Sequence, residues 1–127
     1  MNLKNYQILI VDDASTVRMY HRSILEREGF TVSEAVNGIE AIEKILLQRF
    51  DALLVDVNMP MQDGYTFLKN LRSLDVYQPP AVMISTEAQA SDHNLAFQAG
   101  ANFYLAKPIK PESLIEVCKL LIGVSGE

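Results

Sequence analysis

Short apolar runs in this chain repeatedly end in a chemically reactive polar residue. The runs, each with the polar residues that follow it, are Ile8–Val11 before Asp12 and Asp13, Leu53–Val55 before Asp56, Val82–Ile84 before Ser85, and Phe103–Ala106 before Lys107. If each run is a buried parallel strand, these polar groups all lie at the edge where open α/β sheets bind ligands. The sequence therefore predicts one small site that combines carboxylates, a hydroxyl and an ammonium group, which suits a divalent cation and a phosphoryl group.

Segments with helical spacing of apolar residues lie between the runs, which indicates repeated strand–helix units. Ser15 and Ser91 are expected to cap the first and fourth helices, and Pro111 to lie in the first turn of the last one. The other expected elements are a strand at Thr31–Ala35, a central strand at Asp51–Val55 and a helix at about Tyr65–Ser73. Right-handed crossovers then place helices on both faces of a parallel sheet, which predicts an α/β three-layer sandwich.

Helical spacing also predicts which side chains face the sheet. His21 and His93 lie on helical segments without partners at metal-ligand spacing, so we expect both to be exposed or half-packed rather than ligands. The helix residues expected in stripes that face the core include Tyr20, Leu46, Leu95, Ala96 and Ala99.

Length and composition limit the function classes. The 127 residues suit one domain, 1–127, with no output domain. Lys and Arg total 11 against 16 Asp and Glu, and this net charge of -5 argues against a nucleic-acid-binding surface. The single cysteine, Cys118, fits the apolar pattern of the last helix as a packed thiol. There is no signal peptide and no apolar run of membrane-spanning length, so we expect a cytoplasmic protein that does not bind membranes.

Five motifs stand in register along the chain. They are Asp12 and Asp13; Asp56 with Asn58, Met59 and Pro60; Asp63 with Gly64; Ser85 with Glu87; and Lys107 with Pro108. In order and position they resemble the receiver domain of bacterial two-component response regulators, over essentially the whole chain, and most of all its stand-alone, CheY-like members. The resemblance implies a flavodoxin-like (βα)5 fold with a parallel five-stranded sheet in the order 2-1-3-4-5.

The resemblance also implies that Asp56 accepts a phosphoryl group from a phosphohistidine, on a sensor histidine kinase or a histidine phosphotransfer protein. A carboxylate is a poor nucleophile toward a phosphoryl group because like charges repel, so a bridging cation is needed. We expect Mg²⁺, with Mn²⁺ as an alternative, bound directly by Asp13, Asp56 and the backbone carbonyl of Asn58. Asp12 is expected to hold a coordinated water, and Lys107 to pair first with Asp56 and then with the phosphoryl group.

In this family a hydroxyl at the position of Ser85 moves toward the phosphoryl group, and an aromatic residue at the position of Tyr104 turns inward. The expected function is therefore a phosphorylation-dependent switch that controls a downstream protein, with chemotaxis as one pathway. Self-catalysed phosphoryl acceptance and autodephosphorylation are the only chemistry expected, so the chain is not predicted to be an enzyme. Helical spacing places His93 and Phe97 side by side on the outside, and with Tyr104 they form the expected partner face of a monomer or a phosphorylation-dependent dimer.

Three residues around the site are expected to tune the lifetime of the phosphoryl group or access to it. Asn58 and Glu87 flank the path of an attacking water. Thr86 is a departure from the family, which usually has alanine or glycine there, and its β-branched side chain is expected to narrow access to Asp56.

A phosphorelay intermediate or a phosphate sink would use the same site, and either one is an alternative function. Two other classes of protein fit the residues less well. A Mg²⁺-dependent phosphatase of the haloacid dehalogenase type needs an acid/base aspartate two residues after its nucleophile, where this chain has Asn58. A flavodoxin-like electron carrier needs a phosphate-cradling loop after the first strand, where Asp12 and Asp13 would repel a phosphate.

Overall fold

The computed structural model describes residues 3–59, 62–86 and 89–124 of the chain. Its strands form one parallel, 5-stranded sheet in the order β2-β1-β3-β4-β5. The strands are β1 (Gln7–Val11), β2 (Thr31–Ala35), β3 (Ala52–Asp56), β4 (Ala81–Ser85) and β5 (Phe103–Ala106). The predicted flavodoxin-like (βα)5 fold and its strand order are confirmed.

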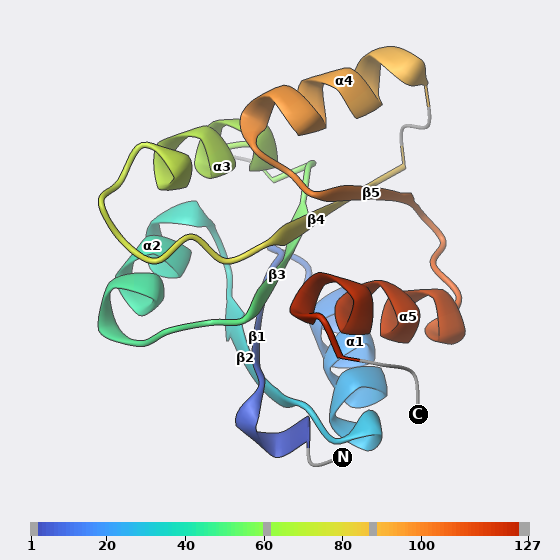
Figure 1. The fold of residues 1–127 in the computed structure, drawn as a ribbon. Coiled ribbons are helices and arrows are strands. Elements are labelled where there is room, and N and C mark those ends of the chain that lie inside the picture. Colours follow the sequence, from blue (N-terminus) through green and yellow to red (C-terminus); the bar gives the residue numbers. More distant parts are fainter. Residues whose placement is uncertain (1–2, 60–61, 87–88, 125–127) are drawn as a thin grey trace.

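Helices cover both faces of the sheet (Figure 1). The helices are a 3-10 turn η1 (Leu3–Asn5), α1 (Ser15–Glu28), α2 (Gly38–Leu47), α3 (Gly64–Arg72), α4 (Ala90–Ala99) and α5 (Pro111–Ile122). Figure 1 shows α1 and α5 together on one face, with α2, α3 and α4 on the other. Within the described residues, no helix is both long and apolar enough to cross a membrane.

Alternate residues of each strand pack into two separate hydrophobic cores, one on each face of the sheet. Ile8 and Ile10 of β1 pack in the core under α1 and α5, whereas Leu9 and Val11 pack in the core under α2, α3 and α4. Strands buried on both faces need apolar residues at every position, which explains the uninterrupted apolar runs. The runs end where the strands leave this double cover, so the first polar residues lie at the carboxyl edge of the sheet.

The structure corrects both predicted helix caps. Ala14, and not Ser15, occupies the N-cap position of α1. Its backbone N–H donates to the Asp12 carboxylate at 2.8 Å, so the acidic loop satisfies this donor itself. At α4 the N-cap residue is Gln89 and not Ser91, because the Asp92 carboxylate accepts the Gln89 backbone N–H at 3.2 Å.

Three apolar helix residues were wrongly predicted to face the core. Tyr20 is 51% exposed, Leu46 is 60% exposed and Leu95 is 45% exposed. The opposite error concerns His21, which is buried at 6% exposure. In α1, Tyr20 and His21 both fit the helical spacing of Ile24, and the tertiary packing selects the histidine.

Candidate functional site at the carboxyl edge of the sheet

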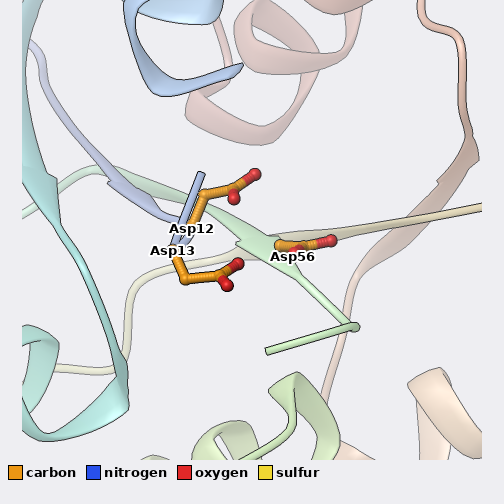
Figure 2. A group of neighbouring side chains, drawn as sticks. All are labelled: Asp12, Asp13 and Asp56. Carbon is orange, nitrogen blue, oxygen red and sulfur yellow. The ribbon is translucent and has the colours of Figure 1, made fainter. Parts of the chain in front are cut away.

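Three carboxylates meet where β1 and β3 end side by side. Asp12 and Asp13 directly follow β1, and Asp56 is the last residue of β3. One carboxylate oxygen from each residue lies within 4.8 Å of those of the other two. Figure 2 shows the carboxyl groups extending from the two strand ends in a similar direction. Asp12 and Asp56 are buried whereas Asp13 is exposed, so the cluster opens to solvent on the side of Asp13.

Asp12 is fixed by hydrogen bonds at its backbone and its side chain. Its N–H donates to the Ala35 carbonyl of β2 at 3.1 Å, and its own carbonyl accepts from the Arg18 guanidinium at 2.6 Å. Burial raises the pKa of Asp12, the Ala14 N–H lowers it, and the Asp56 carboxylate raises it further. The cluster therefore holds negative charge that burial disfavours, which is the setting in which a bound cation is stabilising.

Lys107 provides the positive charge of the site. Its ammonium nitrogen lies 3.1 Å from an Asp56 carboxylate oxygen, and its backbone N–H donates to the Ser85 carbonyl at 2.7 Å. The Asp56 side chain is only 5% exposed, while that of Lys107 is 26% exposed. The peptide bond between Lys107 and Pro108 is cis. This pair is charge-assisted and largely shielded from water, and the lysine can follow added charge because its ammonium lies on a flexible stem.

Ser85 and Asn58 lie beside this ion pair. The Ser85 side chain is fully buried, and its hydroxyl lies 3.4 Å from the Asn58 side-chain carbonyl. Gly64, at the start of α3, packs so closely that a Cβ would come within 2.5 Å of the Asp56 carbonyl oxygen. A side chain at this glycine would displace the loop that carries Asn58. Glu87, the other predicted tuning residue, lies outside the described residues.

A cavity of about 530 Å³ opens next to Lys107. Its walls come from α1 and from the segments that follow β4 and β5, and they consist of Thr16, Val17, Tyr20, His21, Thr86, Lys107, Pro108 and Ile109. Thr86 is exposed and lines this cavity, so the expectation that it narrows access concerns this side of the site. Burial lowers the pKa of His21, and the charge of Lys107 lowers it further. The sequence prediction missed this cavity because it placed Tyr20 in the core.

Tyr104 points inward and is held between α3 and α4. It is 6% exposed, and its ring centroid lies 4.4 Å from that of His93. Tyr65 of α3 reaches the same place, where burial first, and then the neighbouring Tyr104 and Asp92, raise the Tyr65 pKa to about 12. The sequence prediction did not single out Tyr65. His93 is half-buried, as expected, but it contacts Tyr104 and does not lie on the outside with Phe97. Phe97 itself is 50% exposed, as its helical spacing predicts.

The sequence and the fold were compared with known proteins. A family model described as the response regulator receiver domain matches residues 8–119. The chemotaxis protein CheY of Bacillus subtilis is 39% identical over 112 residues, which cover 87% of this chain and 92% of CheY. The transcriptional regulatory protein ResD of the same species is 34% identical over 116 residues, which cover 91% of this chain and 48% of ResD. The chain thus spans about half the length of ResD and most of the length of CheY.

A solved structure with the same fold adds information on the site. The receiver domain of sensor histidine kinase PA1611 from Pseudomonas aeruginosa has a TM-score of 0.85 and 31% sequence identity, and the match covers 93% of this chain and 98% of that one. It was solved with a magnesium ion coordinated in the active site cleft. The matching family model spans most of the chain, and both the fold and the acidic edge agree with it. This chain therefore belongs to the response regulator receiver domain family.

Proposed function

We propose that this receiver domain is a signalling switch that accepts a phosphoryl group on Asp56. Receiver domains act as switches in two-component signalling and are not enzymes in the ordinary sense. The observation that supports Asp56 is its position, because its buried carboxylate both belongs to the acidic cluster and pairs with Lys107 at 3.1 Å. Asp12 lies in the same cluster, but one of its oxygens is occupied by the Ala14 N–H.

In the proposed transfer, an Asp56 carboxylate oxygen forms a bond to phosphorus while the phosphorus–nitrogen bond of a donor phosphohistidine breaks. The donor imidazole leaves with the electron pair of that bond, and hydrolysis of the acyl phosphate later releases phosphate and restores the carboxylate. Mg²⁺, or Mn²⁺ with similar oxygen preferences, would neutralise the repulsion between the carboxylate and the phosphoryl group. Asp13, Asp56 and the Asn58 backbone carbonyl would bind the ion directly, and Asp12 would hold one of its waters.

The groups around Asp56 then respond to the added charge. The Lys107 ammonium would bind one phosphoryl oxygen, and the buried Ser85 hydroxyl would donate to another. Movement of Ser85 toward the phosphoryl group would draw the segment after β4 with it and change the surroundings of Tyr104. Asn58 and Glu87 would set the lifetime of the phosphoryl group, and Thr86 the access of small donors.

The cavity beside Lys107 supports docking of a donor protein, either a sensor kinase or a phosphotransfer protein that carries a phosphohistidine. Transfer from such a donor would take place in the cytoplasm. On α1, Tyr20 lines the cavity and is 51% exposed, and the preceding residue, Met19, is 66% exposed. A donor helix with an apolar face would cover these side chains and bring its histidine to Asp56. A small phosphodonor does not need this surface. Changes to the surface should therefore affect phosphoryl transfer from a protein donor but not from a small donor.

Intact-mass measurement with acetyl phosphate and Mg²⁺ tests the phosphoacceptor. We expect one added phosphoryl group on the wild-type chain and none on Asp56→Asn, which keeps the size of the side chain but removes the nucleophilic carboxylate. A phosphoryl group that persists on Asp56→Asn would overturn the proposal. Lys107→Ala and Ser85→Ala are the companion variants, and they should accept the group but lose the phosphorylation-dependent changes in backbone NMR shifts.

The pathway is a separate part of the proposal. The similarity to CheY supports control of a chemotaxis protein, and a phosphorelay intermediate or a phosphate sink would use the same chemistry. A pull-down that compares beryllofluoride-treated with untreated protein distinguishes these roles. A retained motor or receptor-pathway protein indicates chemotaxis, a retained phosphotransfer protein indicates a relay, and no retained protein indicates a sink.

A further inference from the structure

Arg18 connects the acidic loop to β2. This residue lies on α1, and its side chain is only 12% exposed. One guanidinium nitrogen donates to the backbone carbonyl of Asp12 at 2.6 Å, and another donates to the Glu34 carboxylate at 2.8 Å. Glu34 lies on β2 and also binds Arg22 at 2.7 Å. The guanidinium is therefore held by Glu34 on the side of β2, which leaves another of its nitrogens directed at the Asp12 carbonyl oxygen.

The Asp12 carbonyl has a special place in the acidic cluster. It belongs to the planar peptide unit that joins Asp12 to Asp13, so its direction fixes the direction of the Asp13 N–H. Asp12 is held by its burial and by its bonds to Ala35 and Ala14. Asp13 is exposed, so packing does not orient it in the same way. The Arg18 hydrogen bond thus restrains the peptide plane from which the Asp13 residue continues.

Geometry, rather than charge, is the main effect of Arg18 on the cluster. Glu34 neutralises the guanidinium at 2.8 Å. A hydrogen bond to a carbonyl depends on direction, and it acts only on the peptide that it touches.

We propose that Arg18 is a positioning residue for the cation site. It holds the peptide between Asp12 and Asp13 in the orientation that directs Asp13 at the ion. This inference rests on the proposed binding of Mg²⁺ by the acidic cluster. Partners that orient a metal ligand typically change metal affinity by about 10- to 100-fold when they are removed. Because Asp13 would be one of several ligands, we expect the effect of Arg18 near the lower end of this range.

Calorimetric titration with Mg²⁺ tests the inference directly. Arg18→Ala should bind Mg²⁺ on the order of tenfold more weakly than the wild type. Arg22→Ala is the matched control, because Arg22 also binds Glu34 but has Glu26 as its other partner. It should bind Mg²⁺ like the wild type. Arg18→Lys keeps the charge but cannot span both acceptors with a planar fork, so its affinity should also fall.

The NMR chemical shift of the Asp13 backbone amide is a second measurement. A general loss of stability would not change this shift in the folded protein. This nitrogen shares the peptide unit with the Asp12 carbonyl, so loss of the Arg18 hydrogen bond should shift its resonance even without Mg²⁺. In Arg22→Ala the same resonance should stay in place. Thermal unfolding of the variants reports any shared loss of stability, and Arg18→Lys carries the test if Arg18→Ala does not fold.

The outcomes separate this inference from the proposed function. Wild-type protein that does not bind Mg²⁺ would refute the cation site itself. Wild-type binding, together with unchanged affinity and an unchanged Asp13 resonance in the Arg18 variants, would overturn the positioning role alone. Equal losses of affinity in Arg18→Ala and Arg22→Ala would also overturn it, because they would assign the effect to the Glu34 ion pairs and not to the Asp12 carbonyl.

Discussion

The helix beside the acidic cluster and the helix beside Tyr104 are attached to the sheet very differently. Helix α1 buries His21, Ile24 and Leu25, and the Arg18–Glu34 ion pair ties it to β2. The residues that α4 buries are two alanines, Ala96 and Ala99, while its larger apolar side chains are 45–50% exposed. Because hydrophobic stabilisation grows with the apolar area buried, at roughly 25 cal/mol per Å², α1 is held far more strongly than α4.

This difference matches the two tasks of the proposed switch. A cation site needs ligands that stay in place, and the anchored α1 keeps the acidic loop in one geometry. A responding surface needs an element that moves at small cost, and elements with few buried apolar contacts open most easily. In the proposed switch the two tasks are thus divided across the sheet, with the cation ligands at the ends of β1 and β3 and the responding groups at the ends of β4 and β5.

The largest expected effect compares one leucine from each helix. Leu25→Ala in α1 removes a fully buried side chain and should lower the free energy of unfolding by roughly 2 to 5 kcal/mol. Leu95→Ala in α4 removes a side chain that is 45% exposed and should change it by about 0.5 kcal/mol or less. Urea unfolding followed by circular dichroism measures both, since the chain contains no tryptophan. Similar losses in the two variants would show that α4 is as firmly attached as α1.

Much of this arrangement could be predicted from the sequence, because strands buried on both faces leave a simple signal. The apolar runs located the strands, and the first polar residue after each run located the groups now found together at the carboxyl edge. Asp56 shows the limit of this signal. The strand was expected to end at Val55, whereas β3 includes Asp56, because the backbone ladder continues one residue beyond the last apolar side chain.

The helices were harder to predict, because each has one buried stripe whose limits depend on its neighbours. In α4, helical spacing put Leu95 in the core-facing stripe and His93 outside, but His93 contacts Tyr104 and Leu95 is 45% exposed. The Arg18–Glu34 pair was missed because it joins residues 16 positions apart on different elements, so no local spacing indicates it. Local patterns therefore predicted the reactive groups of the site, but not the contacts that orient them.

The second prediction concerns the exposed side of α4. Phe97 of α4 is 50% exposed. If this side binds a partner or a second copy of the chain, Phe97→Ala should weaken that binding by about 1 to 3 kcal/mol, the range for an aromatic side chain buried at an interface. Pull-down or sedimentation of beryllofluoride-treated protein measures the loss. Phosphoryl acceptance and the free energy of unfolding should stay near wild type.

A control from another helix shows whether the effect belongs to this surface. Leu47, at the end of α2, is 86% exposed, and Leu47→Ala should leave the same binding unchanged. Two results would contradict the prediction. Unchanged binding of Phe97→Ala would remove the surface from the proposed switch, and a large loss of thermal stability would show that Phe97 supports the core.

The smallest expected effect concerns the buried charge of Asp12 and what it costs in stability. Burial raises the pKa of Asp12 above its usual value of 3.8, so at pH values just above 3.8 the folded chain binds more protons than the unfolded chain. Without a cation, this group should therefore make the protein less stable as the pH rises from 3.8 through the folded pKa, and the loss should persist at neutral pH. Asp12→Asn removes the charge, while its side-chain oxygen can still accept the Ala14 N–H.

We therefore expect Asp12→Asn to be more stable than the wild type at neutral pH without Mg²⁺, by on the order of 1 kcal/mol, and to lose this part of the pH dependence. Added Mg²⁺ should raise the melting temperature of the wild type more than that of the variant, because binding stabilises the folded state only where the site is intact. Melting curves by circular dichroism between about pH 4 and pH 7, with and without Mg²⁺, measure both effects. A variant less stable than the wild type without Mg²⁺ would show that Lys107 and the Ala14 N–H already compensate the Asp12 charge. In that case the fixed side of the site would be stable by itself, and the contrast with α4 would rest on hydrophobic burial alone.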